Sequence, residues 1–370
     1  MLKKIFTIEI PNNRLFGLDL MRAMAILFVM FGHSIFFLPE NIKSHLHAFV
    51  VDGVSLFFVL SGFLIGSILI RDFERGINLK VIFNFWIRRW FRTIPIYFLI
   101  LSFLIILTGF EKPSFFYFNY FVFIENFFSP MPDFFSEAWS LSIEEWFYLI
   151  TPIILLLLKT IFKEKPLKTL ILLTALFFIA GTLYLRFYRY YKIDIPKGFP
   201  LWDSHFNRQI ITRLDSLMFG VLAAVLKHYF PHLFQYKKKI QLLLGITLVI
   251  FLQYYIHTHH NFVIYTIYFT LNSLGIMLML PFFSDYNPFT NKKNFFYKII
   301  TYTSLISYSL YLVNFTLIST IIIPYINTIY ENTILNITVF WGLSSIISVI
   351  LYKYFELPTT KLRDHLKKTK

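Results

Sequence analysis

Long apolar runs separated by short polar stretches dominate the chain. A run of about 20 apolar residues is long enough to cross a bilayer as an α-helix, because each residue advances the helix by about 1.5 Å. The pattern predicts about ten such helices in one all-α membrane domain over residues 1–370. The predicted spans are 16–38, 49–70, 93–110, 138–158, 168–185, 208–226, 240–257, 262–283, 299–323 and 335–354.

The first span, FGLDLMRAMAILFVMFGHSIFFL, carries three ionisable residues: Asp19, Arg22 and His33. Each such side chain at membrane depth costs roughly 2.5–3.5 kcal/mol on insertion scales, so it is usually kept for a function. Arg22 and His33 lie eleven residues apart, which is three helical turns plus about 20°, so both fall on one stripe. They are separated by roughly 16 Å along the helix axis. The spacing indicates a row of functional side chains that extends through the membrane.

Composition supports a polytopic membrane protein. The 370 residues are 57% hydrophobic and 21% aromatic, with a mean hydropathy of +0.63, which is unlike a soluble domain of this length. The net charge of +15 comes from basic residues in short loops, a pattern typical of membrane topology and not of nucleic-acid binding. The absence of cysteine excludes disulfides, thiolate zinc sites and a cysteinyl acyl intermediate.

The distribution of Lys and Arg predicts the orientation. About 26 of these residues fall in one set of loops and 7 in the other. Because cytoplasmic loops are the basic ones, we expect both termini to be cytoplasmic. The segment MLKKIFTIEIPNNR lacks the apolar core and small residues of a cleaved signal peptide, so we expect the first span to be an uncleaved anchor.

A basic layer is predicted at the inner face. The sequence FWIRRWFR, in the loop that leads into the third span, brings Arg88, Arg89 and Arg92 to the level of Arg22. Arginine grips phosphates through paired hydrogen bonds, so the cluster favours a phosphate-binding site. Ser61 lies mid-membrane on the second span and is expected near the same ligand. The alternative is that these arginines only set the orientation of the protein.

An outer layer of polar residues is predicted at the depth of His33. In this layer His33 would be a general base, and Glu144 or Asp215 would be the carboxylate that orients its imidazole. Alternatively, these carboxylates join helices by pairing with Arg213, or His33 is a hydrogen-bonded core histidine. The motif HTHH at His257–His260 has no acidic partner nearby in sequence, so we expect a solvated loop and no metal. The further residues expected to contact a substrate are Asp52, Trp139, Ser142, Glu145 and Arg213.

These segments resemble the integral-membrane acyltransferase-3 family over essentially the whole chain. Each motif alone is weak, but their order and topology are specific. The matching features are Arg22-x10-His33, VSLFFVLSGFLIG at Val54–Gly66, RRWFR at Arg88–Arg92, WSLSIEEWFYL at Trp139–Leu149, RLDSLMFG, SYSLYLVN and YFELP.

The resemblance implies transfer of an acyl group, most often acetyl, from cytoplasmic acyl-CoA to a hydroxyl of a cell-surface glycan such as lipopolysaccharide. It implies a multi-pass protein of the bacterial cytoplasmic (inner) membrane. The family's Arg and His correspond to Arg22 and His33, its R-x-x-R to Arg89 and Arg92, and its W-S-L-x-x-E glutamate to Glu144. Some members add an extracytoplasmic hydrolase-like domain. None follows the tenth span here, so we expect direct transfer or a separate partner protein.

Two other function classes remain at this stage. Intramembrane charges also mark the substrate pathway of a transporter or flippase, although the sequence lacks the internal repeat common in transporters. The second class is a catalytically inactive membrane protein that senses acyl-CoA. The enzyme hypothesis predicts acyl-CoA and a carbohydrate acceptor as binding partners in the lipid bilayer, with no metal and no nucleic acid. Glycan-assembly proteins or a second copy of the chain are further expected partners.

Overall fold

The computed structural model describes residues 8–11, 14–47, 50–193, 198–289, 291–292 and 294–368. Basic residues at both termini that were counted for orientation, such as Lys3, Lys4 and Lys370, lie outside the described residues, as do Lys197 and Lys293. Every regular element in the described ranges is helical, which confirms the all-α polytopic class. The orientation of the termini stays a prediction.

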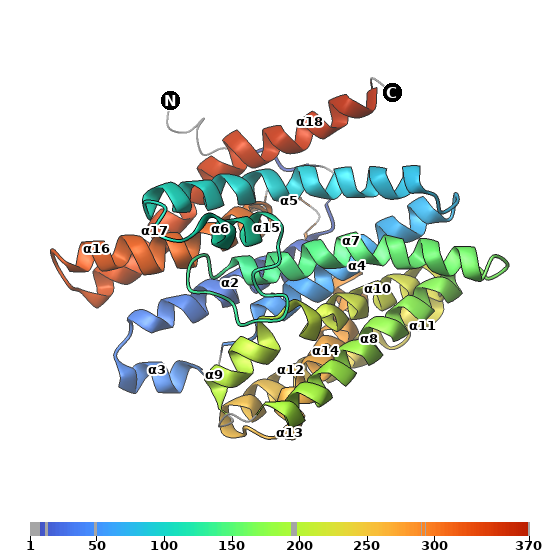
Figure 1. The fold of residues 1–370 in the computed structure, drawn as a ribbon, viewed down its shortest axis with the longest axis horizontal. Coiled ribbons are helices and arrows are strands. Elements are labelled where there is room, and N and C mark those ends of the chain that lie inside the picture. Colours follow the sequence, from blue (N-terminus) through green and yellow to red (C-terminus); the bar gives the residue numbers. More distant parts are fainter. Residues whose placement is uncertain are drawn as a thin grey trace.

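Ten long helices fall on the ten predicted spans, and most of them run broadly alongside one another (Figure 1). Among the described residues, eight helical segments are long and apolar enough to cross a membrane, while α10 and α14 fall below those limits. The count of ten spans therefore stays a prediction. The ten are α2 (Phe16–Ser34), α4 (Gly53–Phe73), α5 (Leu79–Leu107), α7 (Ala138–Ile161), α8 (Leu167–Lys192), α10 (Leu214–Tyr229), α12 (Lys238–Thr258), α14 (Tyr268–Asp285), α15 (Phe295–Val313) and α17 (Thr333–Leu351).

Short helices fill the connections between the long ones. In chain order they are η1 (Ile35–Phe37), α3 (Glu40–His47), α6 (Ser114–Phe121), α9 (Phe199–Trp202), the π-helix η2 (Asp203–Asn207), η3 (Ile210–Thr212), α11 (Pro231–Gln235), α13 (Phe262–Thr266), the π-helix η4 (Asn314–Ile322), α16 (Ile323–Asn327), the π-helix η5 (Tyr352–Glu356) and α18 (Leu357–Lys368).

The third long helix starts far earlier than predicted. Helix α5 begins at Leu79, where the side chain of Asn78 accepts a hydrogen bond from the Val81 amide at 3.0 Å. The segment FWIRRWFR is therefore the first half of this helix and not a loop. Arginine and tryptophan are both compatible with a helix, but arginine lowers the mean hydropathy of the segment. A limit on hydropathy therefore placed the start of this helix too late.

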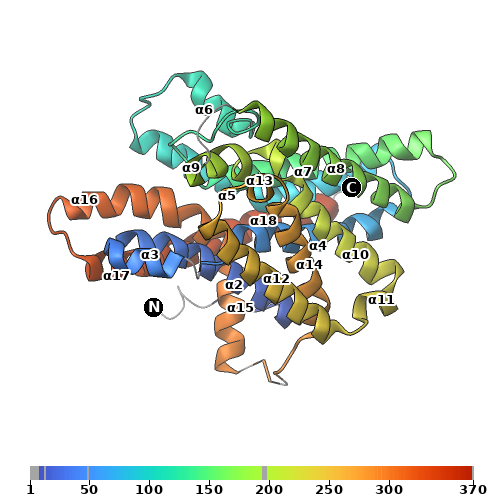
Figure 2. The same cartoon turned by 90° about the horizontal axis from the view of Figure 1, so that it is seen from below.

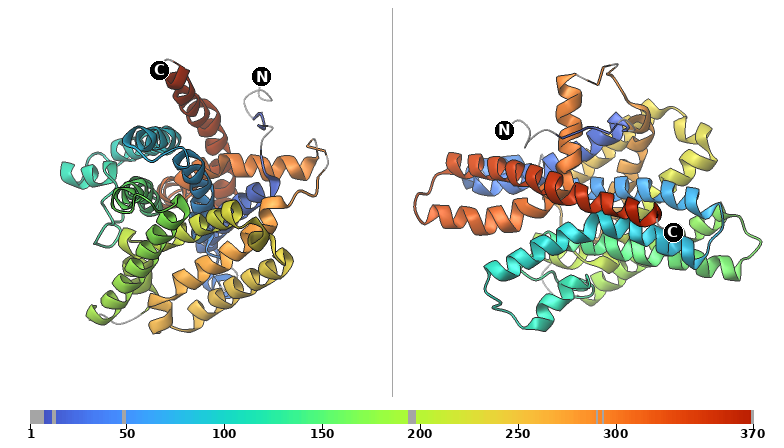
Figure 3. Two further views of the ribbon diagram at one scale, coloured as in Figure 1. Left: turned by 90° about the vertical axis from the view of Figure 1, so that its right-hand side faces the viewer. Right: turned by 90° about the horizontal axis from the view of Figure 1, so that it is seen from above.

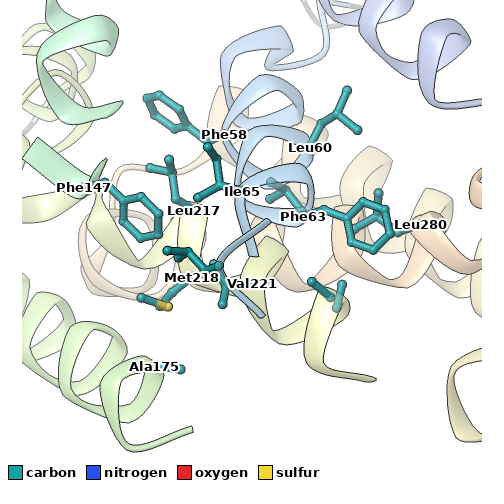
Figure 4. Close-up of a cluster of buried hydrophobic side chains, with 14 of the residues drawn as sticks. Phe58, Leu60, Phe63, Ile65, Phe147, Ala175, Leu217, Met218, Val221 and Leu280 are labelled. Carbon is teal, nitrogen blue, oxygen red and sulfur yellow. The ribbon is translucent and has the colours of Figure 1, made fainter. Parts of the chain in front are cut away.

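Helix α4 is the centre of the bundle and packs closely against α10. A Cβ built on Gly62 would lie 1.9 Å from the Leu217 carbonyl oxygen, and one built on Gly220 would lie 2.1 Å from the Val59 carbonyl oxygen. Only glycine permits this approach, which is a common way for membrane helices to gain contact. Around it lies a cluster of buried apolar side chains from α4, α7, α8, α10 and α14 (Figure 4). This packing fixes the inner half of α4.

The ninth span is not one straight helix. The chain turns sharply between α15 and α16, as the views from below and above show (Figures 2 and 3). The turn coincides with the π-helix η4, which begins at Asn314. Such π-helical turns are rare and occur frequently at functional sites. The turn places Asn314 and the residues after it beside α2.

Candidate active site

An inner cavity opens between α2, α4, α5, α7 and α15. It contains about 790 Å³ of open space. Its polar lining comes from every one of these helices and includes Arg22, Ser61, Arg89, Arg92, Thr93, Ser140, Glu144, Tyr148, Ser307, Tyr308 and Tyr311. The structure thus brings together three of the four predicted arginines, Ser61 and Glu144 at one site.

The three arginines of this cavity have no protein partner. In the described parts of the chain, Arg22, Arg89 and Arg92 take part in no side-chain hydrogen bond or ion pair, and the Arg89 Nε is buried. Asp19 does not neutralise Arg22, because Arg14 binds both of its carboxylate oxygens. Arg22 and Arg89 are half-buried and Arg92 is exposed, and a guanidinium that is partly removed from water without a partner is costly. The arrangement is therefore suited to an anionic ligand with several oxygens, such as a phosphate.

Arg88 does not belong to this cavity, so its predicted role in phosphate binding is corrected. Its guanidinium forms an ion pair with Asp72 near the end of α4. Arg89 and Arg92 line the cavity, and Arg88 does not. Helical spacing alone does not separate them, because Arg88 and Arg92 are four positions apart and lie on neighbouring parts of the helix surface. Asp72 is also bonded by Arg71.

Glu144 lies with the arginines and not with His33. Its carboxylate accepts a hydrogen bond from the Tyr148 hydroxyl at 2.6 Å and another from Ser61. Both Glu144 and Tyr148 line the inner cavity. The prediction that Glu144 orients the imidazole is therefore wrong. It supplies the one negative side chain in a cavity with three cations.

An outer cavity lies along the other end of α2 and contains about 1180 Å³ of open space. His33, in the last turn of α2, is part of its wall. The other polar lining residues are Asp52, Ser136, Glu137, Trp139, Trp202, Asp203, Asn207, Arg208, Gln253, His257, Tyr268 and Tyr311. Asp52 and Trp139 are the two predicted substrate contacts found here. In the described residues, no group of His, Cys, Asp and Glu could hold a metal.

Asn314 fixes the protonation pattern of His33. The His33 Nδ1 lies 2.5 Å from the Asn314 Oδ1. The Asn314 Nδ2 donates to the carbonyls of Leu310 at 2.8 Å and Tyr311 at 2.9 Å, which establishes Oδ1 as the acceptor. The Nδ1 of neutral His33 therefore carries the proton, and its Nε2 keeps a lone pair. This is the form of imidazole that a general base requires.

Glu137 holds the π-helical turn that carries Asn314. Its carboxylate accepts hydrogen bonds from the amides of Phe315 at 3.1 Å and Thr316 at 2.6 Å, and from the Thr316 hydroxyl. The Phe315 ring packs against the imidazole with centroids 4.5 Å apart. Burial raises the pKa of Glu137 to about 7. Glu137 is thus a positioning residue for the base, acting through Asn314 and Phe315.

The two cavities meet at Val54 and Tyr311, which line both of them. The Tyr311 hydroxyl accepts a hydrogen bond from Ser140 at 2.6 Å. Arg22 and His33 lie on the same helix on either side of this point, as their spacing predicted. A ligand that reaches past Val54 and Tyr311 would connect the arginines with the base.

The remaining predicted residues are structural. Asp215 forms a fully buried ion pair with Arg186 at 2.5 Å and accepts from Thr270 at 2.8 Å, so it does not contact His33. Arg213 donates to Ser55 at 2.8 Å and lies 3.8 Å from Asp52. These contacts join α4, α8, α10 and α14, as the helix-joining alternative predicted, although Asp215 pairs with Arg186 and not with Arg213.

Two more predicted contacts lie in neither cavity. Ser142 donates to the buried carboxylate of Glu125 at 2.5 Å. Glu145 accepts from Thr93 at 2.7 Å, and its side chain is on the face of α7 next to the one that carries Glu144. Adjacent helix positions point about 100° apart, so only one of the two glutamates can face the cavity. We therefore drop Ser142, Glu145 and Arg213 as substrate contacts.

Sequence reasoning missed Asn314, Glu137 and Tyr311. Two of them lie in the segment SYSLYLVN, and an asparagine within an apolar span is itself a signal of function. Glu137 immediately precedes the motif AWSLSIEEWFY. Their contacts join residues more than 170 positions apart, so the local sequence gives no sign of the pairing.

The fold and the two cavities define a polytopic membrane protein in which a cavity lined by three arginines adjoins a cavity lined by a histidine. The family model described as "Acyltransferase domain" matches residues 15–353. The chain belongs to this acyltransferase family.

Several curated relatives are named as O-acetyltransferases. The chain is 34% identical over 42% of its length to the peptidoglycan O-acetyltransferase OatA of Listeria monocytogenes, and 35% identical over 40% to "Putative peptidoglycan O-acetyltransferase YrhL" of Bacillus subtilis. It is 26% identical over 93% of its length to a "Putative O-acetyltransferase" of Staphylococcus aureus strain COL. The aligned parts are 26%, 25% and 57% of these relatives, so the chain spans little more than half of their length at most. No solved structure matches the chain.

Proposed function

We propose that the protein transfers an acetyl group from acetyl-CoA to a hydroxyl of a cell-surface glycan, across the bacterial cytoplasmic membrane. The observation that carries this proposal is the pair of adjoining cavities. Unpaired guanidiniums of Arg22, Arg89 and Arg92 line one cavity, and His33 with an available Nε2 lines the other. The names of the relatives support acetyl as the group and a glycan as the acceptor.

The arginines would hold the phosphates of CoA at the inner face. Bidentate arginine–phosphate bonds fix both position and orientation. Ser61 and Glu144 lie along the same cavity, where they would border the flexible pantetheine arm. With the arm extended toward Val54 and Tyr311, the thioester would reach the junction of the two cavities. No metal takes part in this scheme.

His33 would act on the acceptor from the outer cavity. Its Nε2 takes the proton of the acceptor hydroxyl while the hydroxyl oxygen attacks the thioester carbonyl. The carbon–sulfur bond then breaks, and the CoA sulfur leaves and receives the proton from His33. General-base catalysis contributes about 10²–10⁴ in rate, and the alignment of an already activated thioester adds to it.

Purified protein in lipid nanodiscs, supplied with [acetyl-¹⁴C]acetyl-CoA, tests the enzyme proposal. We expect release of CoA by the wild type and loss of that release in His33→Ala protein that remains folded. Binding of acetyl-CoA without any release of CoA or acetate would favour a sensor or transporter instead. In cells, mass spectrometry of surface glycans with and without the protein would identify the acetylated unit.

A further inference from the structure

One wall of the outer cavity is formed by residues that follow one another in sequence. Phe199 of α9, Asp203 and Asn207 of η2, and Arg208 directly after it all line the cavity. Gln253 of α12 lines the cavity as well. Neither the proposed chemistry nor the binding of CoA uses any of these side chains.

Two buried polar atoms on this wall lack a partner. Asn207 Nδ2 donates a hydrogen bond to Asp203 Oδ1 at 2.8 Å, and Arg208 Nη2 forms an ion pair with Asp203 Oδ2 at 2.7 Å. Within the described chain, Asn207 Oδ1 and Arg208 Nε are buried and make no hydrogen bond. One atom is an acceptor and the other a donor. A hydroxyl group both donates and accepts, so neighbouring hydroxyls of one ligand can satisfy both atoms.

The charges on this wall cancel, in contrast to those of the inner cavity. Asp203 neutralises Arg208, so this arginine does not present a free cation. The carboxylate of Asp52 borders the same cavity, and it would repel an anion. The Phe199 side chain is 44% exposed and offers an apolar surface for the carbon face of a ring.

We propose that Asn207, Arg208 and Phe199 form the acceptor subsite, and that it binds an uncharged, hydroxyl-bearing sugar ring. The Asp203 carboxylate positions both polar side chains. This inference rests on the proposed function, since it assigns the ligand of the same outer cavity. Arg208 and His33 line the same cavity, so a ring bound at Arg208 would share that cavity with His33.

The test separates the donor reaction from the acceptor reaction. Asn207→Ala and Arg208→Gln proteins are compared with wild type for hydrolysis of acetyl-CoA in nanodiscs without acceptor, and for base-releasable acetate on the surface glycans of cells. We expect surface acetate to fall about five- to tenfold for each variant, with hydrolysis changed less than twofold. Ser204→Ala is the matched control, because Ser204 lies in the same π-helix but outside the cavity wall. It should retain both activities.

Three results would overturn the subsite. Surface acetate could stay at the wild-type level in both variants, or hydrolysis could fall in parallel with it, or mass spectrometry could place the acetyl group on an acidic sugar or a non-sugar unit. Thermal melting in detergent shows whether each variant is folded. A wild type that neither hydrolyses acetyl-CoA nor adds surface acetate would instead refute the proposed function itself.

Discussion

The inner and outer cavities treat charge in opposite ways. In the inner cavity, Arg22, Arg89 and Arg92 form no side-chain hydrogen bond or ion pair within the described part of the chain, and the carboxylate of Glu144 lies in the same cavity. In the outer cavity, Arg208 is paired with Asp203, and Glu137 is bound by the backbone at Phe315 and Thr316. The first arrangement is the one expected for a polyanion, and the second is the one expected for a neutral molecule.

Under the proposed function, this difference would let one membrane protein hold two unlike substrates without mixing them. Unpaired guanidiniums in a site of low dielectric attract phosphates strongly, and they offer little to an uncharged sugar. A cavity whose charges are paired attracts phosphates weakly and can bind an uncharged sugar. The two cavities adjoin at Val54 and Tyr311. The reactive groups of the two substrates could therefore meet there while each substrate is bound in its own cavity.

Loss of the base should have the largest effect. We expect His33→Ala to lower the rate of transfer by about 10²–10⁴, because proton removal from the acceptor is no longer assisted. Binding of CoA, measured by isothermal titration in nanodiscs, should stay within about twofold, since the arginine cavity is unaltered. Transfer at the normal rate in a folded variant would break the assignment of the outer cavity.

Loss of one inner-cavity arginine should act through the phosphates alone. We expect Arg22→Gln and Arg89→Gln each to raise the KM for acetyl-CoA about tenfold or more, because each hydrogen bond to a charged group contributes about 1.5–3 kcal/mol. With acetyl-pantetheine, which lacks the phosphates, the same variants should match the wild type.

Arg75→Gln is the matched control for these variants. Arg75 is exposed near the end of α4, outside the inner cavity, and its substitution removes the same charge. An equal loss with both donors, or an equal effect of Arg75→Gln, would contradict a phosphate site at the arginines.

The partner of His33 should matter less than His33 itself. We expect Asn314→Leu to lower kcat about tenfold, because the acceptor that keeps the proton on Nδ1 is lost and the imidazole can turn. The KM for acetyl-CoA should not change. An unchanged kcat, or a change in that KM alone, would show that Asn314 does not serve the base.

The smallest effect concerns the pH dependence of stability through Glu137. Burial raises the pKa of Glu137 from 4.5 to about 7. Between these values the unfolded chain has released the proton and the folded protein still holds it, so this group lowers stability as pH rises. The slope is at most about 1.4 kcal/mol per pH unit. Thermal melting in detergent should show Glu137→Gln gaining on the wild type between pH 5 and pH 7.

Glu111→Gln, a substitution of an exposed glutamate in the α5–α6 connection, serves as the control for this prediction. Its melting curve should run parallel to that of the wild type with pH. If the Glu137→Gln curve also ran parallel, the buried carboxylate would not titrate in this range.

The sequence predicted the membrane class and the positions of the long helices, because apolar length is a local property. It also predicted that Arg22 and His33 lie on one helix, and that Arg89 and Arg92 share a face, since both follow from the period of an α-helix. It placed the start of α5 too late because the arginines of this helix reduce its hydropathy.

The partners of these residues could not be predicted in the same way. His33 bonds to Asn314, 281 positions later, at a turn that the apolar pattern presents as a straight span. Two carboxylates looked equally suited to His33, but Glu144 faces the arginines and Asp215 is held by Arg186. Which helices pack together decides such pairings, and a single sequence does not contain that information.

The sidedness of the reaction tests the central claim most directly. Inside-out membrane vesicles containing the protein and its glycan acceptor are given [acetyl-¹⁴C]acetyl-CoA on the outside, where the cytoplasmic face is exposed. Transfer through the adjoining cavities predicts labelled O-acetyl groups on glycan inside the vesicles, protected from an added esterase until detergent is added. Label that appears only on glycan at the outer surface, and is removed at once by the esterase, would contradict transfer across the membrane.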